Sequence, residues 1–379
     1  MRKIGCLLTA LCLLICLTAV PAAGTGVEVA GKSALLMDAA TGTVLYEKNA
    51  HEKLSPASVT KVMTLLLIME ALDNGVIGWE DPVTASAAAA AKGGSQIFLK
   101  EGETMTVTEL LKAITVSSAN DAACAMAEYI AGSEAAFVSR MNRRAAQLGM
   151  QDTNFVNCTG LDDSADAAEH LTSAYDIALM SRELMVNHPA ITRYTTIWMD
   201  TVRGGTFGLA NTNKLIRFYP GALGLKTGYT SRAGFCLSAC AQREELLLIA
   251  VVLGADSSAE RFTACRQLLD YGFAGYALVD ASQAARVPVT LGQQDSVAAV
   301  PGADTRLLID KSQRNQVTTR LELEPSVSAP VSLGQRLGTL TVSAGEQVLA
   351  QIPMVAESAV LRKSWGQIFL QVLRAISMG

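Results

Sequence analysis

The sequence predicts an α/β (α+β) fold, in which a mixed sheet is flanked by helices and followed by a small all-β domain and a C-terminal amphipathic helix. Three observations predict it. Strand patterns stand at both ends of a helical middle between residues 33 and 272. Short alternating stretches with glycine and proline between them run from 277 to about 355. Helical spacing returns after Glu357.

Each element follows from a local pattern. Residues 33–38 and 43–47 are predicted strands joined by the turn at 40–42, and they therefore form a hairpin. A second pair is predicted at 234–241 and 246–254, with the polar turn 243–245 between the strands. Helices are predicted at 57–72, 107–117, 121–131, 134–148, 173–186 and about 258–272. Ser133 is the predicted N-cap of the helix at 134–148.

A chain of 379 residues suggests two domains, and its 50% apolar content allows a sizeable core. We expect a catalytic domain at 24–276, a β-rich domain at 277–355 and an amphipathic helix at 356–379. Residues 1–23 resemble an export signal, because Arg2 and Lys3 precede an apolar run that ends at small residues near 20–22. An uncleaved anchor is the alternative, although the run is short for a membrane span.

Charge and cysteine content exclude several classes of function. A net charge of −4 without a basic run gives no electrostatic case for nucleic acid. Five cysteines follow the signal, and an odd number argues against a disulfide framework. Cys236 and Cys240 lie four apart on a predicted strand, which places both on one face as small packing residues. No CxxC pair or paired histidines indicate a metal, so His51, His170 and His188 are predicted to be surface or packing residues.

Three short motifs carry the candidate chemistry. Ser58 and Lys61 are three apart at a helix start, where Ser55 can cap the helix and the lysine can serve as base for the serine. A surface lysine near a helix start is the alternative. Ser118 and Asn120 follow a helix that ends in a buried turn, where a hydroxyl and an amide can relay a proton and hold a peptide. An ordinary N-cap for the helix starting at Asp121 is the alternative, and it is the favoured one when the pair is taken alone.

The third motif is Lys226-Thr227-Gly228, just before the strand at 234. Lysine and threonine can bind a carboxylate, and glycine allows a substrate backbone to approach a strand. Charge protection of a strand edge is the alternative. Each of the three motifs is weak alone, but all three occur once and in the order of the active-site serine penicillin-binding proteins and β-lactamases.

Together the motifs resemble the low-molecular-weight penicillin-binding proteins, specifically the D-alanyl-D-alanine carboxypeptidases of serine peptidase family S11. The resemblance covers about residues 30–275 and implies a β-lactamase/transpeptidase-like fold. It also includes Leu36-Met37-Asp38 with Thr41-Gly42, Gly94-Ser95, Leu99 to Gly102, Asn120-Asp121-Ala122, Asn157 with Gly160 to Asp162, and Gly224-Leu225. Ala119 departs from it, because the family more often has glycine there; this puts relative rates in doubt, not the chemistry.

The resemblance implies the following roles. Ser58 attacks the carbonyl between the two D-alanines, and Lys61 accepts its proton. Ser118 passes a proton to the leaving amine, while Asn120 binds the substrate amide and steadies Lys61. The remaining residues bind substrate: Lys226 and Thr227 the terminal carboxylate, Gly228 the backbone, and the Tyr229 and Ser58 N–H groups the oxyanion. No cofactor or metal is implied.

Alternatives within the same chemistry are a DD-endopeptidase, a transpeptidase, a β-lactamase or a peptidoglycan sensor without turnover. Glu183 and Asn187 have the spacing of an ordinary exposed helical pair rather than of a β-lactamase base. Peptidoglycan stem peptides and β-lactams are the expected partners, with no nucleic acid.

The C-terminal segment predicts a location. Leu361, Trp365, Ile368, Phe369, Val372 and Ile376 form one apolar stripe at helical spacing, with Lys363 and Arg374 largely off it. We expect this helix to hold an exported enzyme on the outer face of the cytoplasmic membrane, near the cell wall. A helix packed on the β domain is the alternative.

Overall fold

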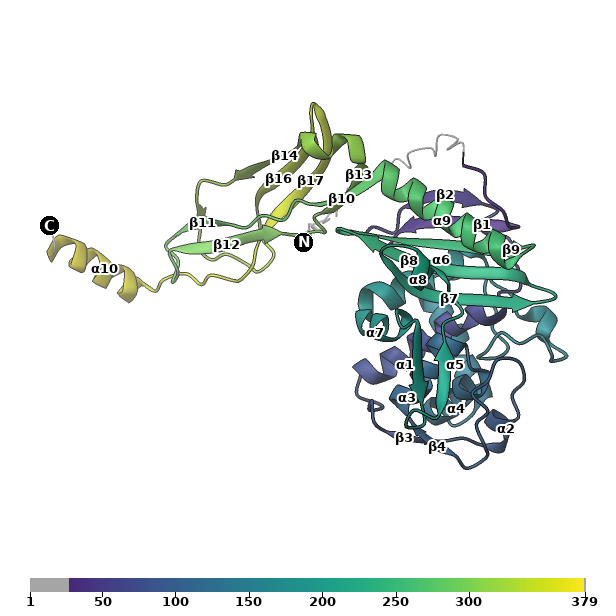
Figure 1. The fold of residues 1–379 in the computed structure, drawn as a ribbon. Helices are drawn as coiled ribbons and strands as arrows, with labels where there is room; N and C mark the ends of the chain where they lie inside the picture. Colours follow the sequence, from purple (N-terminus) through teal and green to yellow (C-terminus); the bar gives the residue numbers. More distant parts are fainter. Residues whose placement is uncertain (1–26, 378–379) are drawn as a thin grey trace, which may run out of the picture.

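The computed structural model describes residues 27–377, so the predicted export signal lies outside the described residues. The first region is built on a five-stranded sheet in the order β2-β1-β9-β8-β7 (Figure 1). Its four strand pairings are all antiparallel, so the sheet is antiparallel rather than mixed as predicted. The region as a whole combines helices with this sheet, as predicted. The strands are β1 (Ser33–Asp38), β2 (Val44–Lys48), β7 (Ala222–Thr230), β8 (Gly234–Arg243) and β9 (Leu246–Ala255).

Side chains on successive residues of these strands point to opposite faces, and each face has its own core. Leu35 and Met37 of β1 join the larger core, whereas Ala34 and Leu36 join the smaller one. The smaller core packs under α9 (Ser258–Gly275), which lies across one face of the sheet (Figure 1). The larger core is covered by α1 (Lys61–Asp73), α3 (Val107–Ser117), α4 (Asn120–Ala131), α5 (Glu134–Gln147) and α6 (Ala174–Asn187).

The long elements lie close to their predicted positions. Helix α3 has the predicted bounds, and Ser133 caps α5 by accepting a hydrogen bond from the Ala136 N–H. Cys236 and Cys240 both pack in the larger core, as their spacing indicates. The five described cysteines are free and buried.

Several short elements were not predicted, because three or four residues show too little periodicity. They are β3 (Pro82–Thr84), α2 (Ala87–Ala90), β4 (Thr104–Thr106), α7 (Thr192–Thr195), β5 (Met199–Val202), β6 (Phe207–Ala210), α8 (Leu215–Phe218) and the 3₁₀ turns η2 (Ala167–Glu169) and η3 (Pro189–Ile191). The 3₁₀ turn η1 (Ala57–Thr60) occupies the start of the helix predicted at 57–72. Strand β7, which carries the third motif, was also missing from the prediction.

The second region is all-β and has a separate core. Strand β10 follows α9 directly and pairs with β13. The other strands form a six-stranded sheet in the order β14-β16-β17-β12-β11-β15. The strand bounds are β10 (Tyr276–Asp280), β11 (Ala285–Thr290), β12 (Ser296–Pro301), β13 (Arg306–Asp310), β14 (Val317–Leu323), β15 (Val327–Ser328), β16 (Arg336–Ala344) and β17 (Gln347–Ala356), with the 3₁₀ turn η4 (Lys311–Gln316) between β13 and β14.

The C-terminal helix is shorter than the expected 356–379. Helix α10 (Trp365–Ser377) begins nine residues later, because the preceding segment is held along the β domain. Val331 and Val360 exchange two backbone hydrogen bonds of 2.9 Å, and the Lys363 N–H donates to the Leu291 carbonyl at 2.8 Å. Leu361 therefore lies before the helix and outside its stripe. Within residues 27–377, no helix combines the length and the apolar character needed to cross a bilayer.

Candidate active site

The nucleophile candidate Ser58 lies in the 3₁₀ turn η1, immediately before α1. The residue before it, Ala57, has a left-handed backbone with φ of 49°, which a residue with a side chain rarely adopts. This conformation separates Ser55 from the helix, and the predicted Ser55 cap is wrong: Pro56 is the N-cap of η1 and Thr60 that of α1. The turn leaves Ser58 half-buried at the start of the helix.

Lys61 begins α1 and is fully buried. Its Nζ lies 2.9 Å from Ser58 Oγ and 2.8 Å from the Thr159 carbonyl oxygen. Burial lowers the pKa of Lys61 to about 7, although the nearby Cys158 and Asp121 favour its charged form. The lowered pKa makes a neutral amine available beside the serine near neutral pH.

The Thr159 carbonyl holds the Lys61 amino group in place. The family resemblance implies this steadying role for Asn120. The loop of Thr159 is anchored from two helices: the Cys158 N–H donates to Glu134 Oε1 at 3.2 Å, and Thr64 Oγ1 donates to the Cys158 carbonyl at 2.6 Å. Thr159 is 98 residues from Lys61 in sequence. Sequence spacing could not reveal this contact, although Asn157 and Gly160 were noted in the same segment.

The second motif forms the buried turn between α3 and α4. Ser118 is left-handed with φ of 63° and 4% exposed, and Asn120 is 2% exposed. The Asn120 N–H donates to the Ser95 carbonyl, and Asn120 Nδ2 donates to the Gly93 carbonyl, both at 2.7 Å. Asn120 Oδ1 is buried and has no partner among the described residues, so it is an available acceptor.

Asp121 fixes the position of this turn. Its carboxylate is fully buried and accepts backbone hydrogen bonds from Ile97 at 3.1 Å and from Leu99 at 2.9 Å. The segment containing Ser95 is therefore tied to the first turn of α4. Hydrogen bonds from backbone N–H groups to a carboxylate are strong, so Asp121 positions Asn120 through the backbone.

The third motif lies on β7, the strand at the edge of the sheet. Lys226 is 1% exposed, and its Nζ donates to the Thr227 carbonyl at 3.0 Å. Burial lowers the pKa of Lys226 well below its usual value, and the positive charges of Lys61 and Arg261 act in the same direction. The two lysines therefore share one electrostatic environment. A ligand carboxylate would relieve the desolvation and the repulsion.

Three further residues lie in or beside the third motif. The Oγ1 atoms of Thr227 and Thr212 are 2.7 Å apart, which adds a second hydroxyl to the motif. Arg261 of α9 is 7% exposed and donates from Nη1 to the Gly228 carbonyl at 2.8 Å. Tyr229 is 56% exposed, and its ring lies tilted against that of Phe235 with centroids 4.3 Å apart. Thr212 and Arg261 were not predicted, because neither belongs to a local sequence pattern.

Gly228 brings β7 against the nucleophile turn. A Cβ atom at this position would lie 2.6 Å from the Pro56 carbonyl oxygen and 3.1 Å from the Ser58 nitrogen. No side chain fits at that distance. The first and third motifs, which are about 170 residues apart in sequence, therefore meet at backbone contact distance.

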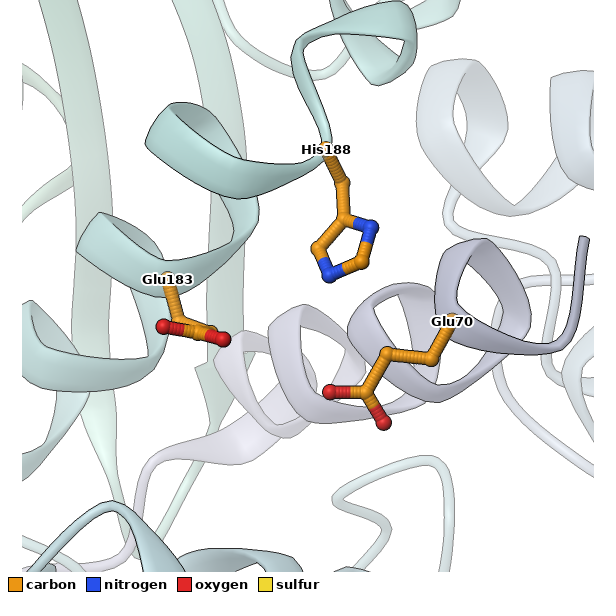
Figure 2. A group of neighbouring side chains, drawn as sticks. All are labelled: Glu70, Glu183 and His188. Carbon is orange, nitrogen blue, oxygen red and sulfur yellow. The ribbon is translucent and has the colours of Figure 1, made fainter. Parts of the chain in front are cut away.

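A separate cluster of titratable groups lies at the far end of α1. Figure 2 shows Glu70 of α1 facing Glu183 and His188 at the end of α6, and these three are the described residues that come near a metal-ligand arrangement. Arg144 already bridges the two carboxylates, with Nε 2.6 Å from Glu70 and Nη2 2.6 Å from Glu183. His188 Nδ1 contacts Asp73 at 2.5 Å. The cluster is an ion-pair network that joins α1, α5 and α6.

Comparison with known proteins identifies the family. Residues 18–257 match a family described as D-alanyl-D-alanine carboxypeptidase, Peptidase_S11. The chain belongs to this family. Residues 276–362 match the C-terminal domain of penicillin-binding protein 5. The chain is 45% identical over 334 residues to the D-alanyl-D-alanine carboxypeptidase DacF of Bacillus subtilis, covering 86% of this chain and 85% of the relative.

Solved structures of relatives share the fold of this S11 peptidase. Penicillin-binding protein 5 from Haemophilus influenzae is 29% identical with a TM-score of 0.75, covering 89% of this chain and 99% of that chain. Penicillin-binding protein D2 from Listeria monocytogenes, solved in an ampicillin-bound form, is 31% identical with a TM-score of 0.57, covering 65% and 99%. The predicted fold class is confirmed, including the β domain after the catalytic region.

Proposed function

We propose that this S11 peptidase removes the terminal D-alanine from peptidoglycan stem peptides through an acyl-enzyme on Ser58. The observation that carries the proposal is the contact between Ser58 Oγ and the buried Lys61 Nζ, beside the strand that bears Lys226 and Thr227. A nucleophile, a base of lowered pKa and a carboxylate-binding pair are the parts that a serine carboxypeptidase needs.

Acylation follows from these positions. The neutral Lys61 amine accepts the proton of Ser58 as Oγ attacks the carbonyl carbon between the two D-alanines. The backbone N–H groups of Ser58 and Tyr229 stabilise the oxyanion, and each such donor contributes about 3 kcal/mol to lowering the barrier. Collapse of the intermediate breaks the peptide bond, and Ser118 passes a proton to the departing amine. D-alanine leaves, and the shortened peptide remains as an ester of Ser58.

Lys226 and Thr227 select a substrate that ends in a free carboxylate. An anion beside Lys226 favours the charged ammonium, so substrate binding compensates a charge that burial otherwise opposes. The Thr212 hydroxyl supports Thr227 from the other side at 2.7 Å. Asn120, whose side-chain Oδ1 lacks a partner among residues 27–377, binds the substrate amide as the family resemblance implies.

Water then hydrolyses the ester and regenerates Ser58. A β-lactam would enter the same acylation step as a covalent inhibitor, and the ampicillin-bound relative from Listeria monocytogenes supports this expectation. Glu183 does not serve as a β-lactamase base, because its carboxylate is engaged by Arg144 at 2.6 Å and by Asn187 Nδ2 at 2.8 Å. No observation favours transpeptidation, endopeptidase activity or a sensor without turnover over hydrolysis.

The direct test is D-alanine release from a pentapeptide ending in D-Ala-D-Ala. Mass analysis of the product should show loss of one alanine with the wild-type enzyme, and no loss above background with Ser58→Ala. Cross-linked muropeptides assayed in parallel distinguish an endopeptidase. Labelling of Ser58 by a fluorescent penicillin without peptide turnover would favour the sensor.

We expect Lys226→Ala to lower kcat/KM for the acid peptide by about 10- to 100-fold, the value of a hydrogen bond to a charged group. A peptide whose C-terminus is an amide should be a poor substrate for the wild type, and the variant should lose the preference for acid over amide. Lys214→Ala, which changes an exposed lysine, is the control. Equal wild-type rates for acid and amide peptides would remove the assigned role.

The location of the enzyme is also a proposal: an exported protein held by α10 at the outer face of the cytoplasmic membrane. Trp365, Phe369 and Ile376 are 89%, 65% and 73% exposed, so their apolar face has no packing partner among the described residues. Figure 1 shows α10 projecting from the β domain, away from the catalytic region. This exposure supports a membrane surface over packing on the β domain. The side chain of Arg374 lies outside the described residues.

Flotation with anionic vesicles tests the anchor. A protein beginning at Gly24 and ending at Met378 should float with the vesicles, whereas one ending at Ser364 should remain in solution with its β domain intact. The shorter protein keeps Val360 and Lys363, which the β domain binds. In the longer protein, Phe369→Glu should weaken flotation and Gln367→Glu, on the polar face, should do so less. Equal flotation of the two lengths would remove the anchor.

A further inference from the structure

The turn that carries Ser58 depends on an unusual backbone conformation. Ala57 is left-handed and fully buried, and it directs the chain so that Ser58 reaches Lys61. Its carbonyl oxygen accepts a hydrogen bond from Thr60 Oγ1 at 2.8 Å. Gly160 packs on the same carbonyl so closely that no Cβ fits there. A conformation of this kind persists only where its surroundings determine it.

His170 supplies the next contact outward from the turn. Its Nε2 lies 2.8 Å from Thr60 Oγ1, and its Nδ1 lies 3.1 Å from the Val156 nitrogen. A backbone N–H can only donate, so Nδ1 must be the unprotonated nitrogen. The neutral ring therefore carries its proton on Nε2 and donates it to Thr60, whose own hydroxyl donates to the Ala57 carbonyl. The chain of hydrogen bonds runs in one direction, from ring to turn.

We propose that His170, acting through Thr60, is a positioning residue that fixes the Ala57 peptide and so orients Ser58 for acylation. The inference rests on Ser58 as the nucleophile of the proposed function. It assigns no proton transfer to His170, which is not a catalytic residue because the chain touches Ser58 only through the peptide before it.

The surroundings of His170 suit a fixed, neutral ring. The residue is 3% exposed and its ring lies edge-on to Phe155 with centroids 5.7 Å apart. Burial lowers the pKa of His170 to about 4, and the charge of Asp166 opposes that shift only partly. The neighbouring Thr172 exchanges two backbone hydrogen bonds with Leu54, at 2.8 and 2.9 Å. The segment around His170 therefore holds the nucleophile turn from both sides.

The expected effect lies on the chemical step. Substrate binding through Lys226 and Thr227 does not involve this chain, whereas the direction of Ser58 Oγ and of the Ser58 N–H depends on the Ala57 peptide. A displacement of a reacting group by about 1 Å can cost about 100-fold in rate. Loss of these hydrogen bonds should therefore lower the limiting acylation rate constant without changing the affinity of the enzyme for the penicillin in the noncovalent complex.

The test measures acylation of the full-length enzyme by a fluorescent penicillin across concentrations, which separates the limiting rate constant from the dissociation constant. His170→Phe and Thr60→Val should each lower the limiting rate constant by about 10- to 100-fold. Thr60→Ser, which keeps the hydroxyl, and His170→Gln, which can place an N–H near the Nε2 position, should retain most of it. The double variant His170→Phe with Thr60→Val should be no slower than the worse single variant.

His51→Phe is the matched control, since it removes an exposed histidine that contacts Asp152 at 2.9 Å and has no part in the hydrogen bonds from His170 to Ala57. Thermal midpoints show how far each variant is destabilised. Wild-type rate constants in folded His170→Phe and Thr60→Val, or multiplicative losses in the double variant, would overturn the inference. Failure of the wild type to label at Ser58 would instead contradict the proposed function, so the two failures are distinguishable.

Discussion

Lys61→Arg is expected to lower the rate of acylation by a fluorescent penicillin by about 10²- to 10⁴-fold, the usual contribution of a positioned base. Arginine stays protonated and cannot accept the Ser58 proton. It can still donate to the Thr159 carbonyl, which Lys61 Nζ contacts at 2.8 Å, so the change removes the base more than the fold. Lys112→Arg, which replaces a lysine paired with Asp200 at 2.8 Å, should leave acylation unchanged.

The pH profile gives the same hypothesis a second test. Acylation needs the neutral amine, and the pKa of Lys61 lies near 7 in the folded protein. The rate should therefore be flat above about pH 7 and fall about tenfold per pH unit below it, because the neutral fraction falls in that proportion. Stopped acylation assays from pH 5 to 9 measure this. A profile without that limb, or wild-type acylation by Lys61→Arg, would mean that another group is the base.

Much of the fold was accessible from the sequence because its long elements carry strong periodic patterns. The apolar spacing of 107–117 gave α3 its bounds, and the strand pattern with a charged turn gave β8 and β9. Short elements were not predicted because they carry too little pattern; β5 and β6, for example, contain four residues each. The end of the β domain was predicted too early, because Val360 and Lys363 belong to the domain through tertiary contacts, although their local spacing is compatible with a helix.

The residues of the candidate site also divide into those that local motifs predicted and those that only tertiary contacts reveal. Ser58, Lys61 and Lys226 were identified because each belongs to a short motif whose own members lie within a few residues of one another. Thr159 and His170 were not assigned to the site, because they reach Lys61 and Thr60 across 98 and 110 residues of sequence. Gly160 and Gly228 were the accessible signals of such contacts, since a glycine at a packed position indicates that two backbones approach closely.

Gly228→Ala is expected to lower acylation by about 100-fold or more, as the loss of an oxyanion donor does. The added Cβ would meet the Pro56 carbonyl oxygen at 2.6 Å and the Ser58 nitrogen at 3.1 Å. Among the strands of residues 27–377, β7 pairs with β8 alone, so it can move outward without breaking the sheet. That movement separates the Tyr229 N–H from Ser58. The protein should remain folded while its limiting acylation rate falls.

Gly208→Ala provides the matched comparison, because a Cβ there meets nothing within 4 Å and the position lies on the short hairpin strand β6. It should acylate at the wild-type rate. Arg261 holds the Gly228 carbonyl at 2.8 Å and resists the outward movement, so part of the strain in Gly228→Ala should appear as a lower thermal midpoint. If Gly228→Ala acylated as fast as Gly208→Ala, the close approach of β7 to Ser58 would not be needed for the reaction, and the oxyanion donors would have to be sought elsewhere.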